Sequence, residues 1–546
     1  MKEKKLLKQS LLIGALTSSF GVFISKALGL IYYSPLSALA GEENMVFYSV
    51  TYTYYDLLLK ISSAGIPFAI AALVAKYVAK EDYKTANVVR KLGTSIVMAL
   101  SFLCVFFFII LATPLAKQSM GAFASESDIK NLKILFYILL FAVILVPYLS
   151  VVRSYYQGLK RFDLYASSQV LEQFVRVFFI VASGYVFVKV LKLDSIWAIY
   201  MAIAAAGIAA LVSIIFFKLT TRKDDARIAE LINNQESPSE TRSTVFKEIL
   251  TLGIPYLIIS FLGTAGPLIN TTFFLSYATS KAGMPINDAK LSLGILQANC
   301  SKLNAIPQVL TSGFCAGLVP YLTESLEQNN YEKISKQVLQ IVNTVLYILI
   351  PVLFIFFFFA KDIYYIMYGG KNLELGTSLF RASTAIGFTE TVLPIFSSIM
   401  ITLRLKKESI LTLLLTSFIK LSTFFACIRL FWAYGMVVST CLASIAGMII
   451  YMLILKKTFD IRFKQTFNQF GLIILSSFAM VIVPLIIAYL VGFEYTSRLQ
   501  AIVYMGSYGL LMLTGYYLIT AKLKLITKIF GIREPSVLKL FKKFKM

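Results

Sequence analysis

Residues 92–114 read LGTSIVMALSFLCVFFFIILATP, a run without a single charged side chain. About 20 mostly apolar residues are enough for a helix to cross the hydrocarbon core of a bilayer. The stretch therefore predicts a membrane span, and similar runs recur throughout the 546 residues. The chain is 58% hydrophobic and 15% charged, whereas soluble proteins average about 45–50% and 25%. This composition excludes a soluble enzyme, a disordered chain and a disulfide scaffold.

The apolar runs predict an all-α polytopic membrane protein with about fourteen transmembrane helices. Six runs precede a long polar interval and eight follow it. The predicted spans are 9–31, 47–75, 92–114, 131–152, 165–188, 195–217, 248–275, 293–318, 337–359, 376–399, 408–428, 433–455, 468–491 and 498–520.

The basic residues predict the orientation of these helices. If the N-terminus is cytoplasmic, the cytoplasmic segments hold 35 of the 52 Lys and Arg residues and the outer segments hold 11. Lys and Arg are enriched in the cytoplasmic loops of membrane proteins. We therefore expect a multi-pass protein of the bacterial cell membrane with both termini in the cytoplasm.

The polar segments suggest five parts. We predict an N-terminal lobe at 1–217, a cytoplasmic linker at 218–247, a second lobe at 248–456, two further helices within 457–520, and a basic tail at 521–546. The linker can hold a short surface helix. The tail has apolar residues at helical spacing with lysines opposite, a pattern typical of a helix lying on an anionic leaflet.

The two lobes show weak internal similarity. Lys60 precedes Ile66-Pro67 in the second predicted helix, and Lys302 precedes Ile306-Pro307 in the eighth. This pattern predicts a parallel repeat in which each of the two helices kinks at its proline.

Nine charged residues fall within the predicted spans. A charge at the middle of a span costs about 2.5–3.5 kcal/mol on the insertion scale, so these side chains must face one another or water. They are Lys26, Lys60, Arg176, Lys302, Arg381, Lys420, Asp56, Glu172 and Glu390.

Spacing divides seven of these nine charges into two groups. Glu172 and Arg176 are four residues apart with the acid first, as are Asp56 and Lys60, which is the favourable order for an ion pair on one helix. Lys26, Lys302 and Lys420 have no acid nearby on their own helix. These three are better candidates for lining a cavity, with snorkelling or pairing to another helix as the alternative.

The embedded charge is positive overall, which favours an anionic ligand such as phosphate or pyrophosphate. The chain has no histidine, the commonest metal ligand, and its five cysteines are isolated within apolar runs, so no metal site or cofactor is predicted. Six tyrosines between residues 32 and 55 predict an aromatic belt at the outer membrane surface, with stacking on sugar rings as the alternative.

Three motifs carry a resemblance to a known family. They are SKALGLIY at 25–32, RSYYQG at 153–158 and SQVLEQFVR at 168–176. With the order and spacing of the helices, they make the chain similar to the MurJ-like lipid II flippases, in particular the Gram-positive SpoVB-type branch. This family belongs to the multidrug/oligosaccharidyl-lipid/polysaccharide exporter (MOP) superfamily.

The resemblance implies two six-helix lobes arranged as a V around a central cationic cavity. It also implies a flippase, not an enzyme, that moves undecaprenyl-pyrophosphate-linked lipid II from the inner to the outer leaflet by alternating access. The family's essential cavity arginines correspond to Lys26, Lys60 and Lys302. Lysine keeps the charge there but loses the bidentate fork of arginine. Further cavity candidates are Lys420, Arg176, Asp56, Glu172 and Glu390.

The resemblance also bears on partners. The last two helices would flank a groove for the polyprenyl tail. We expect lipid II or a related polyprenyl-pyrophosphate glycan and membrane lipids as partners, without nucleic acid. A monomer is expected, in association with the cell-wall synthesis machinery. The sequence does not distinguish the membrane potential, sodium and protons as the source of coupling energy.

The sequence offers three alternative functions. A flippase for another polyprenyl-linked glycan, such as a capsule or teichoic-acid unit, is the nearest alternative. A multidrug exporter is disfavoured because the embedded charge has the wrong sign for cationic drugs. A membrane glycosyltransferase or polymerase is disfavoured because the outer loops are too short to form a catalytic domain.

Overall fold

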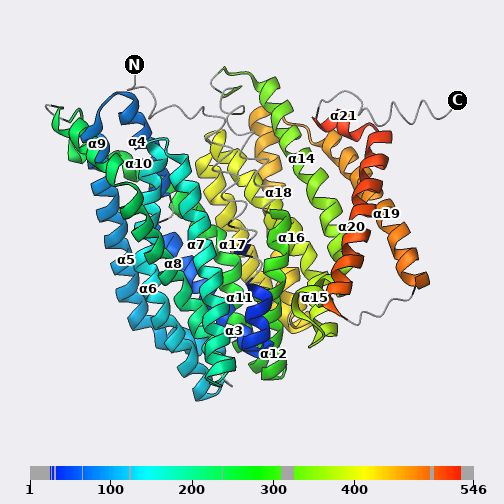
Figure 1. The fold of residues 1–546 in the computed structure, drawn as a ribbon. Coiled ribbons are helices and arrows are strands. Elements are labelled where there is room, and N and C mark those ends of the chain that lie inside the picture. Colours follow the sequence, from blue (N-terminus) through cyan, green and yellow to red (C-terminus); the bar gives the residue numbers. More distant parts are fainter. Residues whose placement is uncertain are drawn as a thin grey trace. The chain divides into compact units, whose positions relative to one another are not determined.

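The computed structural model describes residues 32–530 except 64, 122–123, 236–237, 309–321, 323–324, 327 and 492–496, together with Ser25, Leu28 and Gly29. Every regular element in these ranges is a helix (Figure 1). Twelve helical segments there are long and apolar enough to cross a membrane. They correspond to twelve of the fourteen predicted spans. Of the other two, 9–31 lies largely outside the described residues, and 293–318 is described only as far as residue 308.

The chain forms two compact units, Met1–Ala298 and Asn299–Met546, here called unit 1 and unit 2. The described elements of unit 1 are α2 (Tyr33–Ala40), η2 (Glu42–Asn44), α3 (Met45–Ser63), α4 (Ile66–Ala79), α5 (Tyr83–Met120), α6 (Glu126–Gly158), α7 (Phe162–Tyr185), η3 (Val186–Val190), α8 (Ile196–Thr220), α9 (Arg222–Asn233), α10 (Arg242–Gly263), α11 (Ala265–Ser280) and α12 (Ile286–Gly294). The π-helical segment η4 (Ile295–Cys300) crosses the boundary between the units.

Unit 2 is also helical in its described part. Its elements are a helical segment at 301–308, α14 (Tyr331–Phe358), α15 (Ala360–Tyr368), α16 (Leu373–Thr402), α17 (Lys406–Phe431), α18 (Tyr434–Phe459), α19 (Lys464–Val491), α20 (Arg498–Lys522) and α21 (Leu525–Phe530). A small core joins α14, α19 and α20 around Met480, Tyr508 and Met512.

Unit 1 runs past the predicted lobe boundary at residue 217 because α10 and α11 pack on helices that precede the polar interval. Helix α10 contacts α3, α4 and α5, and α11 contacts α3 and α5. The division into lobes at 1–217 and 248–456 stays a prediction. The predicted surface helix within 218–247 is present as α9.

The second predicted span is interrupted, but not by a kink at Pro67. Helix α3 ends at Ser63 and α4 begins at Ile66, with Gly65 between them at φ +83°. Pro67 lies in the first turn of α4, where its missing N–H costs no helical hydrogen bond. A Cβ on Gly65 would collide with the carbonyl oxygen of Gly253 on α10. The break therefore depends on glycine, and the predicted proline kink is wrong here.

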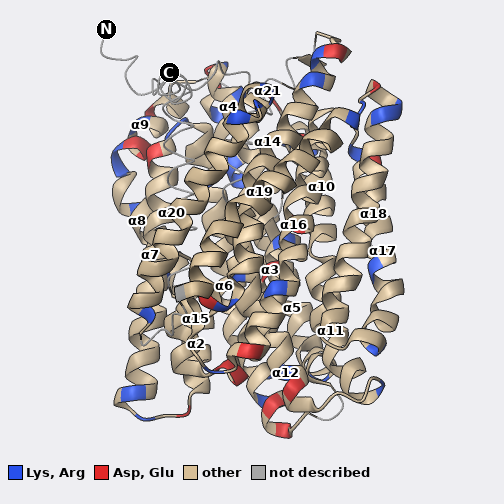
Figure 2. Ribbon diagram, turned by 90° about the vertical axis from the view of Figure 1, so that its right-hand side faces the viewer, with Lys and Arg blue, Asp and Glu red and all other residues tan. Residues whose placement is uncertain are grey.

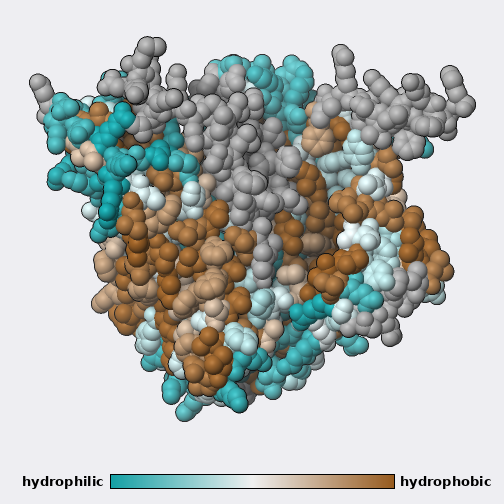
Figure 3. Space-filling view, in the orientation of Figure 1, coloured by the Kyte–Doolittle hydropathy of each residue, from teal (hydrophilic) through white to brown (hydrophobic). Residues whose placement is uncertain are grey.

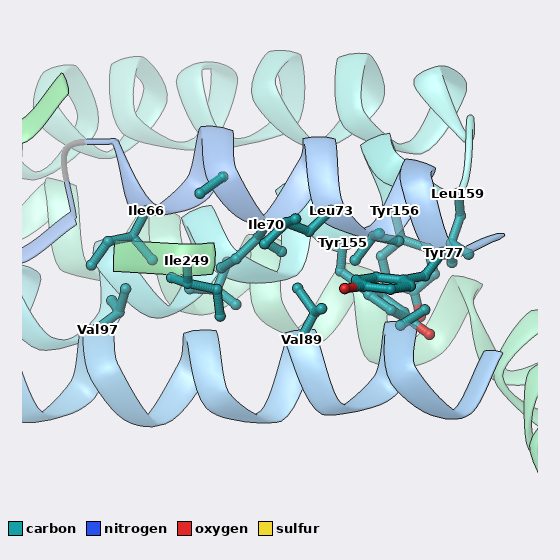
Figure 4. Close-up of a cluster of buried hydrophobic side chains, with 14 of the residues drawn as sticks. Ile66, Ile70, Leu73, Tyr77, Val89, Val97, Tyr155, Tyr156, Leu159 and Ile249 are labelled. Carbon is teal, nitrogen blue, oxygen red and sulfur yellow. The ribbon is translucent and has the colours of Figure 1, made fainter. Parts of the chain in front are cut away.

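One core of unit 1 is apolar and joins α4, α5, α6, α8 and α10. Figure 4 shows Ile66, Ile70 and Leu73 of α4 facing Val89 and Val97 of α5, with Tyr77 close to Tyr155 and Tyr156. The outward faces are apolar as well. On α5, Phe102, Phe106 and Ile110 are exposed. In Figure 3, the middle band of the surface on the side of α5 and α6 is largely brown. Both patterns agree with helices whose surroundings are lipid.

One end of unit 1 carries α9 together with the ends of α4, α6 and α8 and the starts of α5 and α7. We call it the basic end, because it holds the Lys and Arg residues of 76–91, 153–161 and 218–247. Arg161 forms an ion pair with Asp224 of α9. The carboxylate of Asp82 accepts hydrogen bonds from the Gln235 amide, the Ser239 backbone N–H and the Ser239 hydroxyl. These contacts hold α9, Gln235 and Ser239 against the rest of unit 1.

Each unit contains one of the two tryptophans of the chain. In unit 1, the Trp197 ring stacks on Phe187 with centroids 5.4 Å apart and meets Tyr200 edge-on. In unit 2, Trp432 follows the last turn of α17 with φ +52° and is 49% exposed. The two indole rings thus have different surroundings.

Candidate functional site

Charged residues are concentrated near the ends of the helices, and few lie along their middle sections (Figure 2). The nine embedded charges predicted from the sequence fall in both units. Unit 1 contains Lys26, Asp56, Lys60, Glu172 and Arg176, and unit 2 contains Lys302, Arg381, Glu390 and Lys420.

Two arginines share one carboxylate in unit 1. Arg176 Nη2 lies 2.5 Å from Glu172 Oε1 on the same helix, α7, and Arg153 Nη1 of α6 lies 2.7 Å from Glu172 Oε2. The Glu172 side chain is 11% exposed. Arg153 also donates to the hydroxyl and the carbonyl oxygen of Ser168. The predicted pair on α7 is confirmed in geometry, and the cluster keeps one net positive charge.

Arg153 was missed as a member of this cluster because the sequence places it in a loop after the span 131–152. In the structure, α6 continues to Gly158, so Arg153 lies within the helix. A signal was available, since the RSYYQG motif begins with this arginine. A basic residue joined directly to an apolar run can lie on the helix that the run forms.

The tyrosines between residues 32 and 55 form a buried cluster, so the predicted aromatic belt is wrong. Five of the six, Tyr32, Tyr33, Tyr48, Tyr54 and Tyr55, are at most 5% exposed. The hydroxyls of Tyr32 and Tyr48 are 2.7 Å apart, and the Tyr48 ring stacks on Tyr52. Residues 32 and 33 lie at the start of α2, which packs on α7 and α8 instead of facing lipid.

This tyrosine cluster adjoins the arginine cluster. Tyr55 interacts with Arg176, and Tyr52 and Tyr32 also contribute to the electrostatic surroundings of its guanidinium. The embedded cation therefore lies near tyrosine side chains as well as Glu172. Polar neighbours of this kind reduce the cost of holding a guanidinium away from water.

Asp56 and Lys60 form the predicted ion pair on α3. Lys60 Nζ donates to Asp56 Oδ2 at 2.7 Å. The two side chains remain 30% and 41% exposed. The pairing favours the structural interpretation in this conformation. The exposure means that Lys60 is accessible to another anion.

Lys302 lies in the short helical segment after η4 and is half-buried. One asparagine before Lys302 and one after it hold the segment within unit 2. Asn299 donates to the Tyr364 hydroxyl of α15 at 2.8 Å, and Asn304 donates to the Ser383 carbonyl oxygen of α16 at 2.9 Å. These contacts fix the backbone that carries Lys302.

Lys420 is only 3% exposed and is enclosed by α16, α17 and α18. Its ammonium group donates a short hydrogen bond to the Thr440 hydroxyl of α18 and interacts electrostatically with Glu390 of α16. The alternative considered from the sequence, an acid on another helix, therefore describes Lys420 better than an open cavity wall does.

Lys26 lies outside the described residues, so its position stays a prediction, as does the amphipathic helix of the tail after residue 530. Among the described residues, no group of three or more potential Cys, Asp or Glu ligands could hold a metal ion. The predicted absence of a cofactor remains an expectation.

Helices long enough to span a membrane, with charged side chains paired among them, are those of a polytopic membrane protein. The fold is that of the MOP superfamily. It superposes on the structure of the lipid II flippase MurJ in an inward closed conformation with a TM-score of 0.66 and 15% identity, covering 93% of this chain and 99% of the other. It also superposes on a MOP superfamily transporter from Pyrococcus furiosus with a TM-score of 0.58 and 13% identity, covering 83% and 97%.

The chain belongs to the family described as polysaccharide biosynthesis protein, which it matches over residues 11–326. It is 27% identical over 494 residues to the lipid II flippase MurJ of Bacillus subtilis (strain 168), covering 89% of this chain and 90% of the relative. It is 25% identical over 375 residues to stage V sporulation protein B of the same organism, covering 67% and 68%. The resemblance drawn from the three motifs is confirmed.

Proposed function

We propose that this protein is a flippase that moves lipid II from the inner to the outer leaflet of the bacterial cell membrane by alternating access. The observation that carries the proposal is the match to the MurJ relative, which extends over nine-tenths of both chains. A shared fold with a MurJ structure supports the same class of transport. Because fold alone does not define a substrate, the embedded charges must supply the remaining argument.

The embedded groups suit an anionic headgroup. Arg153 and Arg176 together exceed the single charge of Glu172, and Lys60 stays accessible beside Asp56. We propose that Lys26, Lys60 and Lys302 bind the pyrophosphate during transport. For Lys60, this means exchanging a carboxylate partner for a phosphate oxygen, so the cost of freeing the ammonium group is offset by a new charged contact. Hydrogen bonds to charged groups contribute about 1.5–3 kcal/mol each.

The proposal is tested by depleting the protein in its own host and measuring lipid-linked intermediates on each leaflet. Lipid II should accumulate on the cytoplasmic leaflet, and re-expression of the wild-type chain should reverse this. A matched control is re-expression of Lys281→Gln, which removes an exposed charge outside the proposed site. If lipid II still reaches the outer leaflet while another lipid-linked intermediate accumulates, lipid II is not the substrate.

A flippase for another polyprenyl-linked glycan is the second candidate. The family description, polysaccharide biosynthesis protein, favours it because that name is broader than peptidoglycan. Both substrates would present a polyprenyl phosphate group to the same cations. Accumulation of a capsule or teichoic-acid precursor in the depletion experiment would select this candidate.

A further inference from the structure

A pocket separate from the embedded charges opens at the basic end of unit 1. It is formed by α5, α6 and α8 with the first turn of α9, and its volume is about 610 Å³. Sites that bind small ligands usually measure about 300–1,000 Å³. The pocket is therefore large enough for a molecule of headgroup size.

The rim of this pocket is cationic. Arg90 and Lys91 of α5 and Lys218 of α8 line it, and Lys91 and Lys218 are exposed. The Arg90 guanidinium lies 4.8 Å from the centre of the Tyr155 ring, which holds it at the pocket wall. Three positive charges around one opening attract an anion.

Asp225 is the one acid in the lining, and its carboxylate is already engaged. Oδ1 accepts a hydrogen bond from the Tyr156 hydroxyl at 2.5 Å, and Oδ2 accepts one from the Thr221 hydroxyl at 2.8 Å. The carboxylate thus joins α9 to α6 and to the end of α8. The lining retains a net charge of two positive units.

The floor of the pocket is apolar and well packed. Val151, Tyr155, Tyr156 and Phe217 are buried, and the rings of Tyr156 and Phe217 stack with centroids 5.4 Å apart. Both tyrosines belong to the RSYYQG motif, and Figure 4 shows them within the core of unit 1. This floor provides a fixed surface beneath the cationic rim.

The position of the pocket identifies the source of the anion. The predicted span of α5 starts at residue 92, directly after Arg90 and Lys91. On α8, the exposed residues Leu211, Ile215 and Leu219 lie on the turns around Lys218 and form an apolar outer face. The pocket therefore lies where a helix leaves the hydrocarbon, at the depth of lipid phosphates, with a lipid-facing surface beside it.

We propose that this pocket binds the phosphate headgroup of an anionic phospholipid, with Arg90, Lys91 and Lys218 contacting the phosphate and an acyl chain lying along the outer face of α8. The lipid would join α5, α8 and α9 and so stabilise the basic end. This inference does not depend on which substrate the protein transports.

The experiment measures retention of phosphatidylglycerol and phosphatidylcholine by the purified full-length protein, using native mass spectrometry during lipid titration. The variant Lys91→Gln/Lys218→Gln removes two rim charges. The control Lys160→Gln/Lys223→Gln removes two exposed charges from the same end that do not line the pocket. We expect one saturable phosphatidylglycerol molecule on the wild type and the control, and affinity at least fivefold weaker in the rim variant.

A second variant, Ile214→Trp, fills the pocket without changing its charge and should also lose the bound lipid. Thermal unfolding of each variant without added lipid shows whether it is folded, and only variants with wild-type midpoints are compared. Equal retention of phosphatidylcholine, or wild-type affinity in both pocket variants, would overturn the proposal. Displacement of the lipid by millimolar inorganic phosphate would show a soluble phosphate site instead.

Discussion

Arg153 of α6 and Glu172 of α7 are joined by a 2.7 Å ion pair between side chains that are 12% and 11% exposed. Because Arg176 occupies the other oxygen of the same carboxylate, one acid compensates two guanidinium groups from neighbouring helices. The clusters of embedded charge in this protein thus differ in kind. The cluster of Arg153, Glu172 and Arg176 is largely buried, whereas the Asp56–Lys60 pair is partly exposed.

Replacing Glu172 with Gln should destabilise the protein strongly. The change leaves two largely buried arginines without their acid, and breaking a buried ion pair typically costs about 3–5 kcal/mol. We expect a lower thermal midpoint and a lower protein level on immunoblots. The triple variant Glu172→Gln/Arg153→Gln/Arg176→Gln should recover part of the loss. A wild-type midpoint for Glu172→Gln would show that the cluster contributes little to stability.

The role of the lysines is tested by charge. At Lys26, Lys60 and Lys302, Arg should support growth in a depletion strain, Gln should support it poorly, and Glu should not support it. A pyrophosphate ligand needs the positive charge more than it needs lysine itself. Growth at matched protein levels is the measurement. Full growth with all three positions changed to Gln would remove these cations from the mechanism.

Lys60 needs a separate comparison because it is paired with Asp56. If the lysine only compensates this acid, Lys60→Gln/Asp56→Asn should restore the growth that Lys60→Gln loses. If Lys60 binds the substrate, the double variant should fail as the single variant does. Asp56→Asn alone is the control for loss of the acid.

The predicted orientation is tested by labelling single cysteines with a membrane-impermeant maleimide in intact cells. Cysteine at Glu230, on the exposed part of α9, should react only after the cells are permeabilised. Cysteine at Lys281 should react in intact cells. These sites are accessible in the structure, whereas Gln235 is engaged with Asp82. Labelling at position 230 from outside would reverse the topology.

The contacts of Asp82 with Gln235 and Ser239 should resist mild acid. Burial would raise the pKa of Asp82, but hydrogen bonds from Ser239, Thr85 and Gln235 outweigh it and hold the pKa far below its ordinary value. A lowered pKa in the folded state means that the contact contributes stability above about pH 4 and loses it as the pH falls further. A fluorophore on Glu240→Cys should report no change between pH 8 and 5.

In the same measurement, Asp82→Ala should already show at pH 7 the fluorescence of a segment that has lost its contact with residue 82. Its fluorescence should not change further as the pH is lowered. Release of the wild-type contact between pH 6 and 5 would contradict the lowered pKa. Comparable signals from the two proteins at pH 7 would show that Asp82 does not hold this segment.

Gly65→Ala should destabilise unit 1. The left-handed backbone costs a residue with a Cβ about 1–2 kcal/mol, and the collision with the Gly253 carbonyl oxygen adds to that cost. Gly263→Ala is the matched control, because a Cβ there meets nothing within 4 Å and φ is not positive. A midpoint for Gly65→Ala equal to that of the control would show that α3 and α4 can be continuous.

The sequence predicted the spans well because each is a long apolar run whose length is set by the membrane. Pairing was predicted where both partners share a helix, as for Glu172 with Arg176. The prediction of pairing failed where the partners come from different helices, as for Arg153 with Glu172 and for Lys420 with Thr440. The tyrosines were misplaced because an aromatic residue near a span end suits either a lipid interface or a packed core. Whether such a residue lies at the lipid interface or in a packed core depends on the neighbouring helices.

The two tryptophans give this protein a pair of intrinsic optical reporters. Since Trp197 is stacked on Phe187 and Trp432 is half exposed, their emission spectra should differ. Replacing either one with phenylalanine leaves a single fluorophore in a known compact unit. Denaturation followed by emission would then record the melting of each unit separately, without any added dye, and would show whether the two units unfold together or in sequence.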